Sequence, residues 1–117
     1  MTTPKVHIDK VLLARVIHLE GFFIHEEIKR FLEESLTKGG AWIIRTEQAK
    51  FLSTEYLDWV CSYRNFQVKL ACILQKEIFS PEKIALLNQK IPSQQKTRFF
   101  GHLLEARAWL FSANNSF

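Results

Sequence analysis

Glycine and proline are scarce in this chain, and their scarcity is the strongest constraint on its fold. The 117 residues contain four glycines and three prolines, whereas all-β domains need many tight turns. Apolar residues make up 47% of the chain, so it can bury a core large enough to offset its loss of conformational entropy. We therefore expect one all-α domain that spans residues 1–117.

Apolar residues at helical spacing predict an antiparallel bundle of about five helices, two of them long. One segment begins with Ala-Trp-Ile-Ile, which could form a strand, but no partner strand is evident, so a short helix is favoured there. Residues 1–7 and 113–117 are expected to be flexible ends. The expected helices span residues 8–36, 41–52, 54–79, 81–90 and 93–112.

Capping residues support these boundaries. Gly39 can take the left-handed conformation that ends a helix. Ser53 or Thr54 can cap the helix that follows, and Ser80 with Pro81 forms a favourable helix start. Ser93 is the expected cap of the last helix.

A narrow strip of the first expected helix carries Ala14, His18, Gly21 and His25. His18 and His25 are seven residues apart, about 10 Å along a helix, so one metal ion cannot be held by both. Ala14 and Gly21 instead leave a groove in which the backbone of another helix can lie. We expect a packing seam, with a partner helix from this chain or from a second copy.

Motifs for catalysis are not evident. Cys61 and Cys72 would lie about 16 Å apart on one helix, too far for a disulfide, and are expected to be buried thiols. Gly39-Gly40 lacks the pattern of a phosphate-binding loop. We therefore predict a non-enzymatic protein with no catalytic residues, no metal and no cofactor.

The segment "YRNFQVK" is similar to the Arg-polar-x-x-x-His signature of HEPN-type helical ribonucleases. Arg64 and Asn65 match that signature, but Lys69 stands where the family has histidine. The resemblance implies a helical bundle. Because the imidazole is missing, the alternative it leaves is a degenerate fold of this type without activity.

The net charge of +4 is concentrated in the last third of the chain. Residues 81–117 contain five Lys or Arg and two Asp or Glu, which gives +3. Basic side chains near one junction can neutralise phosphates, so a nucleic-acid-binding regulator is an alternative function. The candidate contacts are Lys83, Lys90, Lys96 and Arg98.

No uninterrupted apolar stretch is long enough to span a membrane. Asp9, Lys10 and Arg15 interrupt the apolar region that a signal peptide would need. We therefore expect a cytoplasmic protein that does not bind membranes.

The function favoured by these features is that of a small adaptor or regulator that acts through helical protein–protein surfaces, with itself as a partner in a homodimer. Large apolar residues exceed what a small bundle can bury, and aromatic side chains dominate binding energy at interfaces. The candidate interface aromatics are Trp42, Trp59, Phe99, Phe100 and Trp109.

Overall fold

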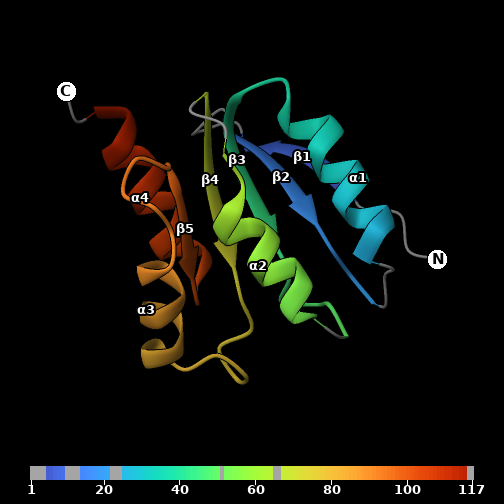
Figure 1. Ribbon diagram of the computed structural model, residues 1–117. Helices are drawn as coiled ribbons and strands as arrows, with labels where there is room; N and C mark the ends of the chain where they lie inside the picture. Colours follow the sequence, from blue (N-terminus) through green and yellow to red (C-terminus); the bar gives the residue numbers. More distant parts are fainter. Residues whose placement is uncertain (1–4, 10–13, 22–24, 51, 65–66, 116–117) are drawn as a thin grey trace.

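In its described residues, the chain forms a five-stranded mixed sheet with four helices, so the predicted all-α bundle is wrong (Figure 1). The computed structural model describes residues 5–9, 14–21, 25–50, 52–64 and 67–115. The strands are β1 (Lys5–Asp9), β2 (Ala14–His18), β3 (Gly40–Arg45), β4 (Val68–Ile73) and β5 (Thr97–Phe100). The helices are α1 (His25–Leu36), α2 (Thr54–Ser62), α3 (Pro81–Gln89) and α4 (Leu103–Asn115).

The strands lie side by side in the order of the sequence, β1-β2-β3-β4-β5. β1 is antiparallel to β2, and the other neighbours are parallel. Each parallel connection contains a helix, and right-handed crossovers that step in one direction place their helices on one face. α1, α2 and α3 accordingly share a face, while α4 covers the opposite one.

Two hydrophobic cores result, one on each face of the sheet. On the first face, α1 buries Ile28, Leu32 and Leu36, which follow each other at intervals of one helical turn. On the second face, α4 buries Ala106 and Leu110 against β2, β3, β4 and β5. The central strands are therefore covered on both sides, which is the environment that parallel sheets require.

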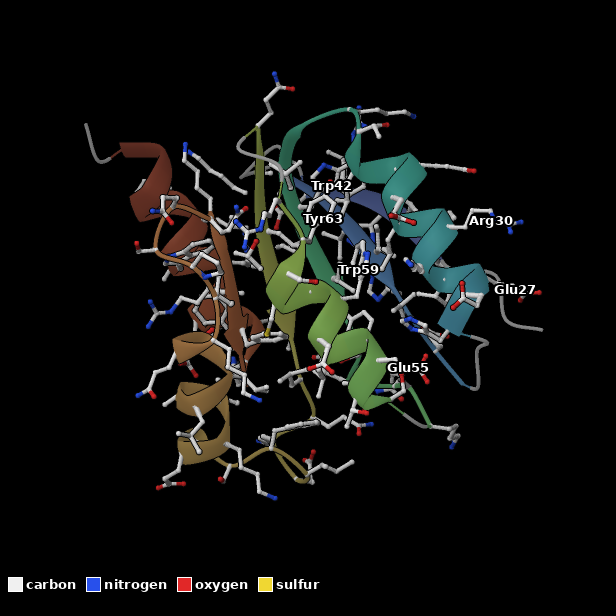
Figure 2. The ribbon with its side chains drawn as sticks, viewed as in Figure 1. Glu27, Arg30, Trp42, Glu55, Trp59 and Tyr63 are labelled. Carbon is white, nitrogen blue, oxygen red and sulfur yellow. The ribbon has the colours of Figure 1, made fainter. Side chains whose placement is uncertain are left out.

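Figure 2 shows how side chains divide between the core and the surface of the helix layer. The Trp59 and Tyr63 rings, one turn apart at the end of α2, have centroids 5.1 Å apart. Glu27 and Arg30 project from α1 away from the sheet. Trp42 of β3 is buried beneath the helices, where its indole Nε1 donates to the Gly39 carbonyl at 2.8 Å.

The long helix expected over residues 8–36 is wrong in its first half. Residues 14–18 form β2, and α1 begins only at His25. A strand buried on both faces has no polar–apolar alternation, so its short apolar run resembles part of a helix. The expected end is confirmed, because Gly39 has φ +70° and its N–H donates to the Leu36 carbonyl at 3.0 Å.

The helix expected over 41–52 is wrong, because residues 41–45 belong to β3, whose partners are β2 and β4, and residues 46–50 form a loop. The expected helix over 54–79 is α2 followed by β4, and the one over 93–112 is β5 followed by α4. Ser93 precedes β5 and caps no helix. The same physical reason applies to β3 and β4, since buried parallel strands carry apolar runs, whereas β5 is a four-residue edge strand with an exposed Arg98.

Two predicted helix starts are confirmed. Ser53 Oγ accepts from the Tyr56 N–H at 3.1 Å, and Ser80 Oγ accepts from the Lys83 N–H at 3.3 Å. Pro81 is the first residue of α3. Local capping chemistry depends on a few adjacent residues, so the sequence alone reveals it.

The expected flexible ends are partly within regular elements. Residues 5–7 belong to β1 and residues 113–115 to α4. Residues 1–4 and 116–117 lie outside the described part of the chain.

At Phe99, the outer edge of β5 is capped by a side chain. Asn88 of α3 donates from Nδ2 to the Phe99 carbonyl at 3.1 Å, and its Oδ1 accepts from the Phe99 N–H at 2.7 Å. The amide therefore pairs with the strand as a peptide group would. Such closure protects an edge from pairing with another chain.

We predict that Asn88→Ala lowers the free energy of unfolding by about 1–3 kcal/mol, because it leaves two backbone groups without their partners. Chemical denaturation of the variant and of wild type would measure the loss. Gln89→Ala, an exposed neighbour on the same helix, is the control. Equal losses in both variants would contradict the role given to Asn88.

Candidate functional site

Polar side chains gather at the carboxyl ends of the parallel strands, and this is where open α/β sheets bind ligands. A hollow of about 210 Å³ lies at the ends of β2 and β3, and a second of about 430 Å³ lies at the ends of β3, β4 and β5. Arg45, Glu47 and Gln48 line both hollows. The two hollows are therefore neighbours along one edge of the sheet.

Arg45 and Glu47 form a two-pronged ion pair at this edge. Arg45 Nε lies 2.8 Å from Glu47 Oε1, and Nη2 lies 2.8 Å from Oε2. This hydrogen bonding raises the pKa of Arg45 and lowers the pKa of Glu47. Both groups are thereby held in their charged forms and satisfied by each other.

Further polar groups at this edge hold the backbone of the β3–α2 loop. Gln75 Nε2 donates to the carbonyls of Glu47 and Ala49, each at 2.8 Å. The buried Thr46 hydroxyl donates to the Ile73 carbonyl at 2.7 Å. These contacts fix the loop to the end of β4. Gln75 and Thr46, which the sequence did not mark as site residues, therefore have structural partners.

His18 of β2 and His7 of β1 form a stacked pair. His18 Nε2 and His7 Nδ1 are 3.1 Å apart, and the ring centroids are 4.8 Å apart. Burial lowers the pKa of His18, and the neighbouring His7 and Arg45 lower it further. The fold therefore favours the neutral form of this imidazole.

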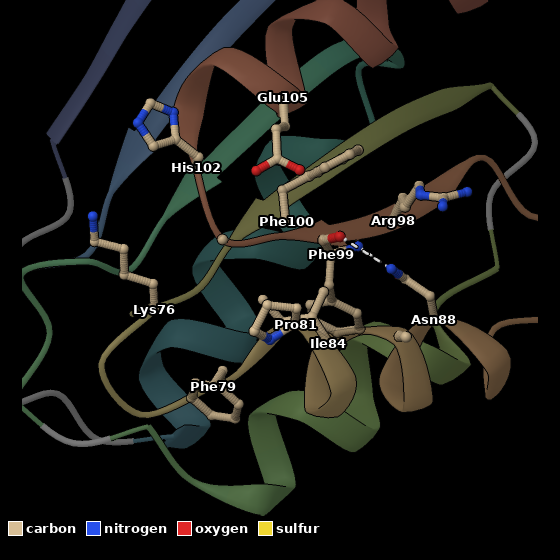
Figure 3. Close-up of a pocket in the computed structure, with 12 residues that line it drawn as sticks. Lys76, Phe79, Pro81, Ile84, Asn88, Arg98, Phe99, Phe100, His102 and Glu105 are labelled. Carbon is tan, nitrogen blue, oxygen red and sulfur yellow. Dashed lines mark hydrogen bonds between the residues drawn. The ribbon is translucent and has the colours of Figure 1, made fainter.

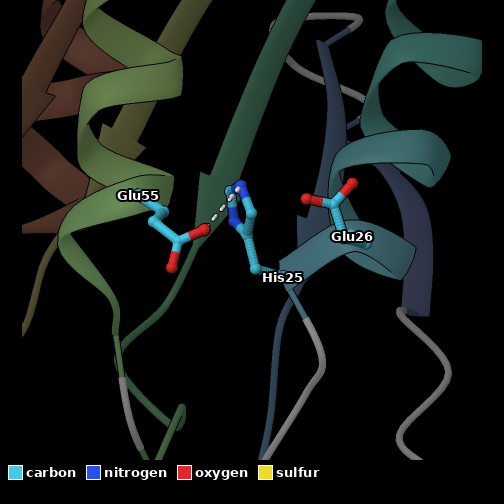
Figure 4. Close-up of side chains that lie close together, drawn as sticks. All are labelled: His25, Glu26 and Glu55. Atoms are coloured by element: carbon cyan, nitrogen blue, oxygen red, sulfur yellow. Dashed lines mark ion pairs between the residues drawn. The ribbon is translucent and has the colours of Figure 1, made fainter.

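His25, Glu26 and Glu55 bring their ligand atoms within 4.8 Å of one another at the first turns of α1 and α2 (Figure 4). His25 Nε2 lies 4.0 Å from Glu55 Oε2, and His25 Nδ1 is buried without a hydrogen-bond partner. The carboxylates are exposed, and helix N-termini favour anions over cations. We therefore assign no metal to this cluster, although long-range folding brings together a histidine and a carboxylate that the sequence did not pair.

A cavity of about 420 Å³ lies between α3, β5 and α4 (Figure 3). Phe79, Ile84 and Phe99 supply apolar walls, while His102 and Glu105 lie at its rim. The His102 Nδ1 accepts from the Leu104 N–H at 3.1 Å at the start of α4. The described lining contains no cysteine, serine or threonine that could act as a nucleophile.

Both cysteines are free and buried. Burial raises the pKa of Cys72 to about 12 and also raises the pKa of Cys61. A thiol acts as a nucleophile only as the thiolate, so neither cysteine is activated. The prediction that they are buried and do not bridge is confirmed, but the expected shared helix is wrong, because Cys61 lies on α2 and Cys72 on β4.

The residues of the expected seam do not form a helical groove. Ala14 and His18 lie on β2, Gly21 forms an isolated bridge with Ala49, and His25 begins α1. Gly21 has φ +71°, a conformation that favours glycine, so its backbone rather than its small size explains its presence. The helical seam is therefore wrong, because β2 and an isolated bridge at Gly21 stand where the helix was expected.

Three of the candidate interface aromatics are core residues. Trp42, Phe99 and Phe100 are buried, each less than a tenth exposed. Trp59 and Trp109 are half-buried, and the Trp109 ring lies 5.6 Å from that of Phe100. The exposed large apolar residues are instead Val6, Ile8, Ile78, Leu86, Leu104 and Phe111.

The four candidate nucleic-acid contacts are all exposed, and Lys83 lies apart from the other three. Lys83 lies in the first turn of α3, and Lys90 caps the opposite end. Lys96 directly precedes β5, and Arg98 lies on β5, where it lines the cavity. Because α3 crosses back from the end of β4 to the start of β5, Lys83 and Lys96 lie at opposite ends of the sheet.

The fold that the ribonuclease resemblance implied is also wrong. Arg64 follows the end of α2, and Lys69 lies on β4, where an α-helical signature would need a helix. Asn65 lies outside the described residues.

Comparisons with protein-family models, curated proteins and solved structures found no match for this chain. Among the described residues, no helix combines the length and apolar character needed to cross a membrane.

We predict that stability rises with pH near the ordinary histidine pKa because of His18. The folded state disfavours protonated His18, so neutral His18 contributes to the free energy of unfolding. This contribution is complete above pH 6.5 and is lost as the pH falls from 6.5 through the lowered pKa of His18 in the folded state. The contribution of Glu47, whose pKa is lowered, is lost only below its ordinary value of 4.5.

Denaturation between pH 8 and 5 would test this, with His18→Gln as the comparison. The variant should show a shallower dependence of unfolding free energy on pH than wild type. Above pH 7.5 the two dependences should be parallel. An equally steep fall in the variant would contradict the role of His18.

We also predict that neither thiol reacts with iodoacetamide at pH 8 in the folded protein, because both are buried and protonated. Mass spectrometry should find no alkylation without denaturant and two alkylated cysteines in guanidinium chloride. Rapid labelling of the native protein would contradict the packing around β4 and α2.

Proposed function

We propose that this protein is a non-enzymatic, cytoplasmic adaptor or regulator that acts through protein–protein surfaces and self-associates as a homodimer. The observation that carries the proposal is the edge strand β1, which no other described strand covers on its outer side and where Val6 and Ile8 are 49% and 58% exposed. Edge strands offer unpaired backbone groups to another chain, and such strand addition is a common mode of protein recognition.

The two edge strands of the sheet differ in whether a side chain pairs with their outer backbone groups. At the β5 edge, Asn88 occupies both backbone groups of Phe99. At the β1 edge, four of the five residues are exposed, and the described part of the chain places no strand beyond it. Among the described elements, the protein thus closes one edge and leaves the other accessible.

A second apolar surface lies on α4 and suits the adaptor role. Leu104 and Phe111 are 64% and 60% exposed, and Ala108 between them is exposed as well. Their spacing of four and three residues puts them on one stripe, opposite the buried Ala106 and Leu110. This stripe supports the idea that a helical surface contributes to recognition.

The polar chemistry of the molecule also favours binding over catalysis. Arg45 and Glu47 neutralise each other, Gln75 holds backbone carbonyls, and the thiols have raised pKa values. The dispersed placement of Lys83 and Lys96 favours a protein partner over a nucleic acid, which needs a continuous basic surface. Free cysteines suit a reducing compartment such as the cytoplasm.

Sedimentation velocity over a range of concentrations would test the proposal. We expect wild type to shift from monomer toward dimer, and Ile8→Lys to weaken the association at least tenfold by placing a charge on the exposed edge. Leu86→Lys changes an equally exposed residue on α3, 59% exposed, and should leave association unchanged. Wild type that stays monomeric at every concentration would contradict self-association.

A further inference from the structure

We infer that β1 pairs with β1 of a second copy, antiparallel and centred on His7, to form one continuous sheet across a two-fold axis. This inference rests on the proposed function and specifies the surface and register of the homodimer. It is argued from the alternation of β1 and from its charge pattern.

The faces of β1 are fixed by its register with β2. Val6 pairs with Ile17, which belongs to the core beneath α1, so Val6 and Ile8 face the side of α1–α3. His7 pairs with Val16, which belongs to the core beneath α4, so Lys5, His7 and Asp9 face that other side. A two-fold axis perpendicular to the sheet keeps each face on its own side.

This symmetry restricts the register, because directly opposed residues in an antiparallel pair share a face. The two-fold axis must therefore cross the paired strands at a residue that lies opposite its own copy, and not between two residues. A centre on Val6 or Ile8 would pair only three of the described residues of β1 with one another. A centre on His7 pairs all five residues of Lys5–Asp9.

The His7-centred register also matches side chains. Val6 lies opposite Ile8 of the second copy, so the two exposed apolar residues of each strand cover one another. Lys5 lies opposite Asp9 of the second copy, a pair of opposite charges at each end.

These charges have partners within one chain. Lys5 Nζ lies 3.6 Å from Glu20 in a pair that is largely exposed and therefore weak. Asp9 Oδ2 lies 3.2 Å from Arg107 Nε, which ties β1 to α4. The lysine is thus free to move toward the second copy, while Arg107 keeps Asp9 in place.

Cysteine cross-linking would test the register in the full chain. Directly opposed residues have Cα atoms about 4.5–5.5 Å apart, within the range of a disulfide, whereas residues offset by two are about 7–8 Å apart. Under mild oxidation with copper–phenanthroline, His7→Cys should form a covalent dimer by itself. Val6→Cys and Ile8→Cys should each form little dimer alone but should form one when mixed.

Gln89→Cys, exposed on α3, controls for random collision, and circular dichroism checks that each variant folds. Preferential dimer from His7→Cys and from the mixture supports the inference. If wild type associates in solution but these cysteines cross-link no faster than Gln89→Cys, the β1 register is overturned while self-association stands. If wild type does not associate at all, both proposals fail.

Discussion

The structure depends on burying β3 and β4 on both faces at once. Ile43, Ile44, Ala71 and Cys72 are completely buried, with neighbouring residues of each strand pointing into opposite cores. Without α4 the second core would be exposed, and without α1–α3 the first would be. Apolar burial on this scale is the dominant favourable term in folding, so the helix layers and the sheet can only be stable together.

This two-sided burial explains where the polar groups lie. Backbone groups at the strand ends must still be paired, and Gln75 and Thr46 donate to backbone carbonyls at the carboxyl edge, where Arg45 and Glu47 pair with each other. The same requirement at the β5 edge is met by Asn88. β1 is an edge strand that pairs only with β2, and its residues are the most exposed of the described strands. The proposed interface lies on this exposed edge.

The sequence predicted local features well and long-range ones poorly. Ser53, Ser80, Pro81 and Gly39 were recognised because a cap depends on residues within one turn. The apolar runs of β2, β3 and β4 lack regular alternation and therefore resemble helices, and helical crossovers need few tight turns, so scarce glycine and proline do not exclude a sheet. The alternation in Lys5–Asp9 was a strand signal, but its partner could be identified only from the fold. Asn88 and the pairing of His25 with Glu55 could not be predicted, since each joins residues brought together by tertiary packing.

Hydrogen–deuterium exchange at low and high protein concentration tests the central claim, that β1 is the interface, most directly. Backbone amides of an edge strand exchange readily unless a second chain pairs with them. The account predicts that exchange in Lys5–Asp9 slows as the protein associates, while exchange in the rest of the described chain, including α4, changes little. Slower exchange confined to α4, with β1 unchanged at concentrations where the protein is dimeric, would contradict it.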